Sequence, residues 1–518
     1  MSGPAASGFA VLSSSRKVVL GAALRTGNLA ANAVVSLLMM PFVVRMLGDR
    51  MYGIWVLVGA FVGYYGLVDL GLSSAVTRHL SAAVGAKDYD ACNRVYNTSL
   101  RLFTGLGLVV LALACGFALA SSKFARTPAD AAVFWKLILI LGLSLALDFP
   151  SKVYNGFLYA YLHIHLLASL DLLSLVLRTA LIIAVLLRGH HVVAMAIVVL
   201  LGTLPAKILP LFYVHKTLPF LQFGWHQWDR ATAKSLFSYG ASSFVIRIAD
   251  LLRFQVDAPV VAGFVGLAAV THYKVAGTLT QYFVQLMQAA TEAFPSIFSR
   301  HEGAKDYDAL KRVFFFGSKI SACSAAFIAF GLIAWGRPFI TRWMGHRYLD
   351  AYPCLVVLVT GWIFGLAQSP SVQLLFGISK HKFFAWFNSM EGGANLVLSI
   401  LLARKYGILG VALGTMIPML VTKIVIQPVY VCWVASINYF DYVRRMGRTL
   451  AVILVALLIP LLLTLKFVAP NYKTLAAVGL LSAIAYVLVL WFLEFTPAET
   501  KMLERAILPR SAVRAGGD

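Results

Sequence analysis

Long hydrophobic stretches alternate with short polar connections along almost the whole chain, from residue 18 to residue 495. An α-helix needs about 20 mostly apolar residues to cross the hydrocarbon core of a bilayer. By this measure the sequence predicts about fourteen transmembrane helices, with no room for a soluble domain between them. The predicted spans cover residues 18–44, 52–80, 95–120, 132–160, 164–187, 191–215, 236–263, 268–298, 313–336, 351–377, 382–403, 408–434, 449–468 and 474–495.

The composition supports this prediction, because 60% of the 518 residues are hydrophobic and only 13% are charged. A soluble domain carries about a quarter charged residues, so a soluble enzyme and a disordered chain are both excluded. The five cysteines are odd in number and scattered, which predicts neither a disulfide framework nor a zinc site. We therefore expect an all-α polytopic membrane protein without a metal or another cofactor.

The remaining charge is strongly basic, with 44 Lys and Arg against 21 Asp and Glu and a net charge of +23. In a membrane protein such a surplus belongs first to cytoplasmic loops facing anionic lipid, and it does not indicate a nucleic-acid partner. Lys and Arg are more frequent on the predicted flanks that share a side with the N-terminus. The first 15 residues are small and polar and do not resemble a signal peptide. With an even number of spans, both termini are predicted to be cytoplasmic.

An internal repeat is visible in two identical segments. Residues 85–91 and 303–309 both read Gly-Ala-Lys-Asp-Tyr-Asp-Ala, at an offset of 218 residues, and the same register pairs Pro41 with Pro259. Six predicted spans separate the two copies, so both halves enter the membrane in the same direction. Such a parallel repeat is typical of transporters in which two helix bundles move against each other.

The repeat divides the chain into two six-helix lobes followed by two additional helices. After the last span, Thr496-Pro497-Ala498-Glu499 is a capping-box pattern, which predicts a short helix at the membrane surface. The expected segments are a cytoplasmic N-terminal segment (1–17), the first lobe (18–216), a cytoplasmic linker (217–235), the second lobe (236–434), two further spans (435–495) and a cytoplasmic tail (496–518).

Polar side chains recur at helical spacing on the first, second, seventh and eighth predicted spans. An ionisable group at membrane depth is costly unless it faces water or a partner, so each is a functional candidate. We expect these faces to line a water-filled cavity between the lobes. The candidate substrate contacts are Arg25, Asn28, Asn32, Arg247, Arg253, Lys274, Gln281, Gln285 and Gln288. The candidates for ion coupling or charge balance are Asp69, Asp250, Asp257 and Glu292.

A competing interpretation treats the charges of the seventh span as internal ion pairs. Arg253 lies three residues after Asp250 and four before Asp257, a spacing that suits pairing on one helix. Arg25 has no acidic neighbour on its own helix, which favours the cavity for this residue. Three further polar faces are expected to join neighbouring helices within a lobe rather than to form a proton or cation site: Asp148, Lys152 and Asn155; Asp171, Ser174 and Arg178; and Asn388, Glu391 and Asn395.

The sequence lacks the motifs of several enzyme classes. It contains no Gly-xxxx-Gly-Lys-Ser/Thr loop, so we do not expect the chain to hydrolyse ATP. A membrane-embedded polysaccharide polymerase or acyltransferase would need a catalytic His or carboxylate in an outer loop. The outer acids Asp49, Asp130 and Asp350 are isolated, which disfavours this class. A transporter is therefore predicted rather than an enzyme.

Several N-terminal motifs resemble the signature of one transporter family. They are Arg25-Thr26-Gly27-Asn28, Pro41, Leu47-Gly48 with Tyr52-Gly53-Ile54-Trp55, and Asp69-Leu70-Gly71-Leu72 with Arg78. This set is similar to the N-terminal region of polysaccharide flippases, the Wzx-like exporters of the MOP superfamily (multidrug, oligosaccharidyl-lipid, polysaccharide). The repeated Gly-Ala-Lys-Asp-Tyr-Asp turn and the two lobes with two extra helices fit the same family.

The resemblance implies a protein of the bacterial cytoplasmic membrane that moves an undecaprenyl-diphosphate-linked oligosaccharide to the outer leaflet. The cargo would feed O-antigen, capsule or exopolysaccharide assembly, with a polysaccharide polymerase and chain-length machinery as further partners. Arg and Lys side chains would contact the diphosphate, and amide side chains would contact the sugar hydroxyls. Rocking of the lobes would give alternating access.

A cation-coupled multidrug exporter of the MATE type, in the same superfamily, is the main alternative. A cavity for cationic drugs would carry a net acidic charge, whereas the candidate groups include as many cations as acids. The charge of the expected cavity therefore does not decide between the two substrates. The two extra spans and the N-terminal motifs favour the polysaccharide flippase.

Overall fold

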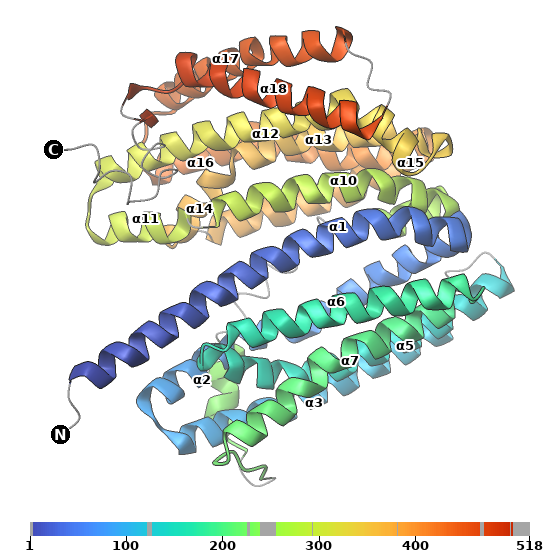
Figure 1. Cartoon of the computed structure of the whole chain (residues 1–518), viewed down its shortest axis with the longest axis vertical. Helices are drawn as coiled ribbons and strands as arrows, with labels where there is room; N and C mark the ends of the chain where they lie inside the picture. Colours follow the sequence, from blue (N-terminus) through green and yellow to red (C-terminus); the bar gives the residue numbers. More distant parts are fainter. Residues whose placement is uncertain are drawn as a thin grey trace. The chain divides into compact units, whose positions relative to one another are not determined.

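The computed structural model describes residues 4–121, 127–224, 228–238, 255–292, 294–380, 382–466, 471–497 and 499–500. Within these residues the chain is almost entirely α-helical and contains no β-strand (Figure 1). Ten helical segments of this part are long and apolar enough to cross a bilayer. The predicted all-α membrane fold is therefore confirmed.

The chain divides into two compact units, Met1–Thr271 and His272–Asp518. The first unit contains α1 (Pro4–Tyr65), the 3₁₀-helix η1 (Gly66–Asp69), α2 (Leu72–Ala86), α3 (Tyr89–Leu119), α5 (Pro128–Ala160), α6 (Ile164–Leu187), α7 (Val192–Thr217) and α9 (Asp257–Phe264). Helix α10 (Leu267–Thr291) begins in the first unit and ends in the second. The lobe boundaries expected from the repeat stay a prediction.

The second unit contains the remaining described helices. They are α11 (Phe294–Gly303), α12 (Tyr307–Trp343), the 3₁₀-helix η2 (His346–Tyr348), α13 (Ala351–Ala367), α14 (Ser369–Gly377), α15 (Lys382–Leu420), the π-helix η3 (Val421–Ile426), α16 (Gln427–Val434), α17 (Tyr439–Lys466) and α18 (Tyr472–Leu493).

Two glycines turn the chain where the sequence predicts connections between spans. Gly48 in α1 has a φ of 76°, and Gly407 in α15 has a φ of 58°. Only a residue without a Cβ adopts this left-handed region readily. Helix α1 thus combines the first predicted span with the start of the second, and α15 combines the eleventh with about the first half of the twelfth. Two of the ten membrane-length segments accordingly hold two predicted spans each.

The second predicted span, 52–80, is not one continuous helix. Helix α1 ends at Tyr65, η1 ends at Asp69, and Leu70 and Gly71 follow at positive φ before α2 begins. Hydropathy stays high across this break, which is why the sequence pattern predicts a single span. The interruption matters because it places the carboxylate of Asp69 at the end of a short 3₁₀ turn, inside the unit.

Helix α10 has the length of a membrane span but is not among the ten apolar segments. Lys274 and a series of glutamines on this helix lower its hydropathy. The preceding predicted span, 236–263, cannot be compared over its whole length because residues 239–254 lie outside the described part of the chain. These features, with the two merged pairs, account for the difference between ten segments and about fourteen predicted spans.

Each unit has a core built by helices that pack side by side. In the first unit α3 packs against α5, α6 packs against α7, and α1 packs against α6. Phe103, Phe149 and Phe157 are fully buried between these helices. In the second unit α12 packs against α13, α13 against α15, and α17 against α18. Large apolar side chains also remain on the outer helix surfaces, as expected where lipid replaces water as the solvent.

The repeated sequence forms the same turn in both units. Lys87 and Lys305 follow a helix with φ of 56° and 55°. The next residues, Asp88 and Asp306, each accept a hydrogen bond from the backbone N–H three positions later, at 2.8 and 2.9 Å. The aspartates therefore act as N-caps of α3 and α12, which stabilises the first turn of each helix.

The segment after α7 lies along α3, and polar side chains of that helix hold it by its backbone. Asn93 bonds both the carbonyl of Phe220 and the N–H of Gln222, each at 2.9 Å. One turn later, Asn97 bonds the carbonyl of Gln222 and the N–H of Gly224, also at 2.9 Å. We call residues 220–224 the strap. The side chains of Asn93 and Asn97 bond its backbone N–H and C=O groups, as the backbone of a neighbouring β-strand would.

The start of the C-terminal tail forms the predicted capping box. The backbone N–H and the hydroxyl of Thr496 both donate to the Glu499 carboxylate at 2.9 Å. Lys319 of α12 lies 3.3 Å from the same carboxylate. Burial raises the pKa of Glu499, but these hydrogen bonds and the ammonium outweigh it and hold the pKa below its usual range. Residues 501–518, where the surface helix would continue, lie outside the described part of the chain.

Candidate functional site

The polar stripe predicted on the first span contacts α6 of the same unit. The amide of Asn28 donates to the carbonyl of Ala168 at 2.6 Å. The guanidinium of Arg178 donates to the side-chain oxygen of Asn32 at 3.1 Å, and the Asn32 amide donates to the carbonyl of Asn28 at 2.9 Å. Both asparagines therefore help to hold α1 against α6.

Arg25 lies on the same stripe, nearer the N-terminus of α1, and is exposed. Its guanidinium is 5.9 Å from the ring centroid of Tyr159, within range of a cation–π interaction. The carboxylate of Asp171 on α6 interacts electrostatically with both Arg25 and Arg178. Arg25 thus shares an acidic partner with Arg178 and still has an open side.

Further charges from α5 and α7 join this group. Lys207 donates to the carbonyl and, at 3.0 Å, to the hydroxyl of Ser144, and it interacts electrostatically with Asp148. Asp148 in turn interacts with Asp171. We refer to these five side chains as the first-unit charge cluster: Arg25, Asp148, Asp171, Arg178 and Lys207. With three cations and two carboxylates, the cluster carries a surplus of positive charge.

The sequence predicts parts of this cluster but not its extent. Asp148, Asp171 and Arg178 are expected to pair within a lobe, whereas Arg25 is assigned to a different surface. Lys207 is not singled out at all, although a lysine in the middle of the predicted span 191–215 is itself a signal. Helical spacing shows which residues share a face, but it does not show which helix that face meets.

Asp69, predicted on the polar side of the second span, is buried in an ion pair. Its carboxylate oxygen lies 3.1 Å from the ammonium of Lys152 on α5, and the Ser73 hydroxyl donates to the same oxygen. Only 1% of the Asp69 side chain is exposed. In this position the carboxylate balances the charge of Lys152 inside the first unit.

The polar face of α10 is largely open. Gln281, Gln285 and Gln288 are exposed, and so is Glu292 just beyond the end of the helix. Lys274 is half-buried, and it makes no hydrogen bond or ion pair with the other residues that the structure describes. A lysine held in this way can accept an anion without first giving up a protein partner.

The seventh predicted span is described only at its end. Asp257 is half-buried at the first position of α9 and interacts electrostatically with Tyr64. Arg247, Asp250 and Arg253 lie outside the described residues. The described part of the chain also holds no group of three or more His, Cys, Asp or Glu that could bind a metal ion.

The second unit contains a buried ion pair that the sequence predicts only in part. The ammonium of Lys423 lies 3.4 Å from the Glu391 carboxylate, and both side chains are at most 3% exposed. The same ammonium donates to Asn388 at 3.2 Å and to Gln427 at 3.0 Å. The Asn388 and Glu391 face is predicted from its spacing, but its cation, in the π-helix η3, is not.

The chain is similar to known membrane proteins over most of its length. Residues 42–353 match the model of a family described as polysaccharide biosynthesis protein. The uncharacterized membrane protein EpsK of Bacillus subtilis (strain 168) is 21% identical over 492 residues, which cover 92% of this chain and 97% of EpsK. A Shigella flexneri protein provisionally named an O-antigen transporter is 22% identical over 421 residues, which cover 78% of this chain and 96% of that protein.

Solved structures with the same fold belong to membrane transporters. The lipid II flippase MurJ, in an inward closed conformation, matches with a TM-score of 0.70 at 14% identity, over 95% of this chain and 100% of MurJ. A multidrug resistance MATE family transporter of the MOP superfamily, in an inward-facing conformation, matches with a TM-score of 0.63 at 16% identity, over 78% and 98%. These likenesses establish the fold and not the substrate. Because the family match covers more than half of the sequence, the chain belongs to the polysaccharide biosynthesis protein family, and its resemblance to polysaccharide flippases of the MOP superfamily is confirmed.

Proposed function

We propose that the chain translocates lipid-linked oligosaccharides, carried on undecaprenyl diphosphate, from the inner to the outer leaflet of a bacterial cytoplasmic membrane. The cargo then passes to a polysaccharide polymerase for O-antigen, capsule or exopolysaccharide assembly. Transport proceeds by alternating access with both termini in the cytoplasm. The family match and the polysaccharide-related name of the Shigella flexneri relative support this proposal.

The observation that carries the proposal is Lys274 on the open polar face of α10. A diphosphate loses much of its hydration on entering a membrane protein and therefore needs a cation to replace the lost water. The half-buried Lys274 has no partner among the described residues that would compete for its charge. The exposed amides of Gln281 and Gln285 on the same helix can donate to sugar hydroxyls and accept from them.

The first-unit charge cluster supplies a second cationic surface. Arg25 is exposed, so its guanidinium can contact a phosphate while Asp171 keeps it oriented. Asn28 and Asn32 act mainly by fixing α1 on α6, so we assign them to positioning this surface rather than to the sugar. Arg247 and Arg253 remain further candidate contacts, and Asp69, Asp250, Asp257 and Glu292 remain candidates for ion coupling or charge balance.

The test replaces Lys274 with glutamine, which removes the charge but keeps a long polar side chain. In a cell without a second flippase, we expect Lys274→Gln to lower surface polysaccharide by at least about tenfold, because the diphosphate loses a charged contact. The matched control is Lys136→Gln, at an exposed lysine of α5, and it should leave the amount unchanged. Membrane levels of both variants are measured by immunoblot.

Two outcomes would contradict the proposal. If Lys274→Gln exports as much polysaccharide as the parent chain at equal protein level, the charge of α10 does not bind the cargo. If deletion of the chain sensitises cells to cationic drugs and leaves surface polysaccharide unchanged, the chain is a multidrug exporter instead.

A further inference from the structure

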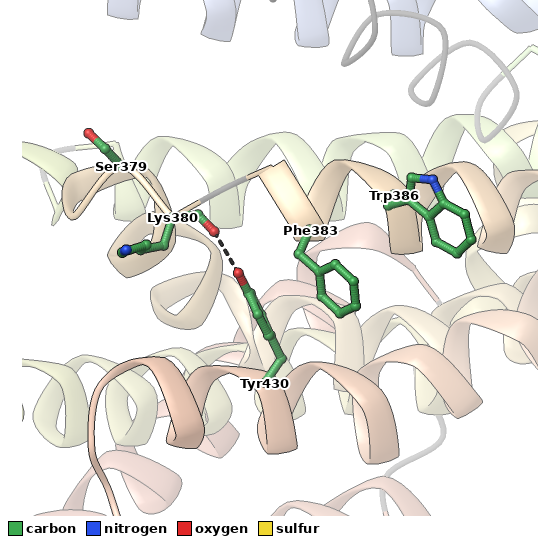
Figure 2. A pocket seen from close by; sticks show the side chains of 5 residues that line it. All are labelled: Ser379, Lys380, Phe383, Trp386 and Tyr430. Atoms are coloured by element: carbon green, nitrogen blue, oxygen red, sulfur yellow. Dashed lines mark hydrogen bonds between the residues drawn. The ribbon is translucent and has the colours of Figure 1, made fainter.

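The second unit contains an open cavity at the turn between α14 and α15. It has a volume of about 580 Å³ and is lined by Ser379, Lys380, Phe383, Trp386 and Tyr430 (Figure 2). This volume falls within the range of small-molecule sites. We call it the turn pocket. None of its residues belongs to the candidate substrate contacts discussed above.

The turn pocket is held in shape by its own contacts. Ser379 has a φ of 59°, and the hydroxyl of Tyr430 on α16 donates to the carbonyl of Lys380 at 3.0 Å, which fixes the turn on α16. The rings of Phe383 and Tyr430 lie 5.1 Å apart, and Phe383 also meets Phe387 edge to face at 4.4 Å. A ligand would therefore meet aromatic rings that are already in position.

The pocket has a cationic end and an aromatic end. In Figure 2 the Lys380 ammonium and the Trp386 ring lie at opposite ends of a row, with Tyr430 and Phe383 between them. Phe383 is 50% exposed and Trp386 is 63% exposed, so their faces are not covered by the chain. This arrangement suits an anionic ligand that also has a flat, partly apolar ring.

The corresponding turn of the first unit shows that the cavity is not a by-product of the repeat. At an offset of 217, Leu162 replaces Ser379, His163 replaces Lys380, and Tyr213 replaces Tyr430. Leu162 has a φ of 58°, so the backbone turns in the same way, but the Tyr213 hydroxyl lies 3.2 Å from the ring Nδ1 of His163 and not from a backbone carbonyl. The cavity beside that turn is only about 10 Å³ and is lined mostly by other positions, such as Phe157 and Val214. The aromatic lining is not repeated, because Leu166 and Ser169 stand where the second unit has Phe383 and Trp386.

From this comparison we infer that the turn pocket is a loading site, which holds the saccharide-phosphate head of the lipid-linked cargo before transport. The C–H face of a pyranose ring stacks on Trp386 or Phe383, and the Lys380 ammonium pairs with the phosphate. In the predicted orientation this turn lies at the cytoplasmic membrane surface, where aromatic side chains are common. The inference rests on the proposed function, because it assigns an entry point to the same cargo.

A phospholipid headgroup is the competing occupant, since it also carries a phosphate. Ethanolamine and glycerol headgroups have no ring to stack on the two exposed aromatic faces, so their chemistry fits only the cationic end of the pocket. A cross-linking experiment separates the two, because it captures the molecule that actually occupies the site.

The experiment uses the photoreactive variant Trp386→p-benzoylphenylalanine of the full chain, in cells that make the polysaccharide. After irradiation, the adducts are identified by mass spectrometry. We expect adducts with a polyprenyl-diphosphate saccharide. The control places the same residue at Phe492, which is 78% exposed on α18 and lies outside the pocket. Phospholipid adducts alone at position 386, or equal glycolipid labelling at both positions, would overturn the inference.

A flux measurement separates a failure of the inference from a failure of the proposed function. We expect Phe383→Ala to slow translocation of a lipid-linked saccharide about tenfold at limiting substrate and to regain the parent rate when substrate is abundant. Phe492→Ala should match the parent chain at both levels. If the parent chain moves no lipid-linked saccharide, the proposed function fails. If the parent chain moves the lipid-linked saccharide and Phe383→Ala moves it at the same rate at limiting substrate, only the inference fails.

Discussion

At the scale of single residues, Lys423 illustrates the conditions under which a charge remains inside a hydrophobic helix bundle. Its ammonium has Glu391 as counter-ion and the side-chain oxygens of Asn388 and Gln427 as hydrogen-bond acceptors. An unpaired charge would be too costly at this depth, whereas a charge with a counter-ion is tolerated. Lys274 differs, because no described residue neutralises it. The two lysines therefore differ: Lys423 is neutralised inside the protein, whereas we propose that Lys274 is available to a ligand.

The burial of the Lys423–Glu391 pair predicts how the stability of the protein responds to substitution. We expect Lys423→Met to lower the free energy of unfolding by about 3–5 kcal/mol, because the Glu391 carboxylate then stays buried without its cation. The double variant Lys423→Met with Glu391→Leu should recover most of this loss, since no charge remains. Stability of the purified protein is measured by thermal unfolding in detergent.

The control is Lys405→Met, at an exposed lysine in α15, for which a change below about 0.5 kcal/mol is expected. A double variant as unstable as Lys423→Met alone would show that the pair contributes through shape or hydrogen bonding and not through its charges.

At the scale of elements, polar side chains on a helix can hold a connecting segment in place, which a hydropathy pattern does not reveal. The strap, residues 220–224, has no regular secondary structure, yet two asparagines one helical turn apart bond its backbone on both sides. Arg101, one further turn along α3, donates to the carbonyl of Gly224. The connection leaving the last helix of the predicted first lobe is therefore tied to α3.

The strap gives a prediction at this scale. Asn97 is fully buried and makes two of the bonds, so Asn97→Ala should free residues 222–224. The backbone around the exposed Lys216, at the end of α7, should then loosen enough for trypsin to cut there. We expect cleavage at this site to be about tenfold faster than in the parent chain, measured by limited proteolysis in detergent.

Thr104→Ala is the control, because the Thr104 hydroxyl bonds only a carbonyl of its own helix and the side chain is exposed. Equal cleavage of both variants would mean that the strap is held by apolar packing instead of by the asparagine side chains.

At the scale of the whole molecule, the fold is more predictable from sequence than the site. Span length follows from the thickness of the bilayer, and the offset of 218 reveals the duplication directly, so an all-α membrane protein could be predicted. The partners of each polar stripe could not. Asn32 meets Arg178, and Asp69 meets Lys152, through helix contacts that periodicity along one helix does not encode. The break before α2 could not be predicted either, because its residues other than Asp69 are as apolar as those of the flanking helices.

The orientation of the chain is a prediction for the whole molecule. The excess of Lys and Arg on the flanks that share a side with the N-terminus predicts that both termini are cytoplasmic. We expect a fluorescent protein fused to the C-terminus to fold and fluoresce, and alkaline phosphatase fused there to be inactive. Phosphatase fused after Gly407, at the turn within α15, should be active. Active phosphatase at the C-terminus would reverse the assignment of sides for every loop, including the turn pocket.

The two capped turns at Asp88 and Asp306 also bear on how the protein is made. Each is closed by hydrogen bonds between residues at most five positions apart, such as that from the Asp88 N–H to the Ala83 carbonyl. A turn of this kind can form as soon as its own residues leave the ribosome, before any distant helix has been synthesised. The first residue of α3 and of α12 is therefore already defined when each helix enters the membrane. Co-translational insertion would then proceed in the same order in each half of the chain.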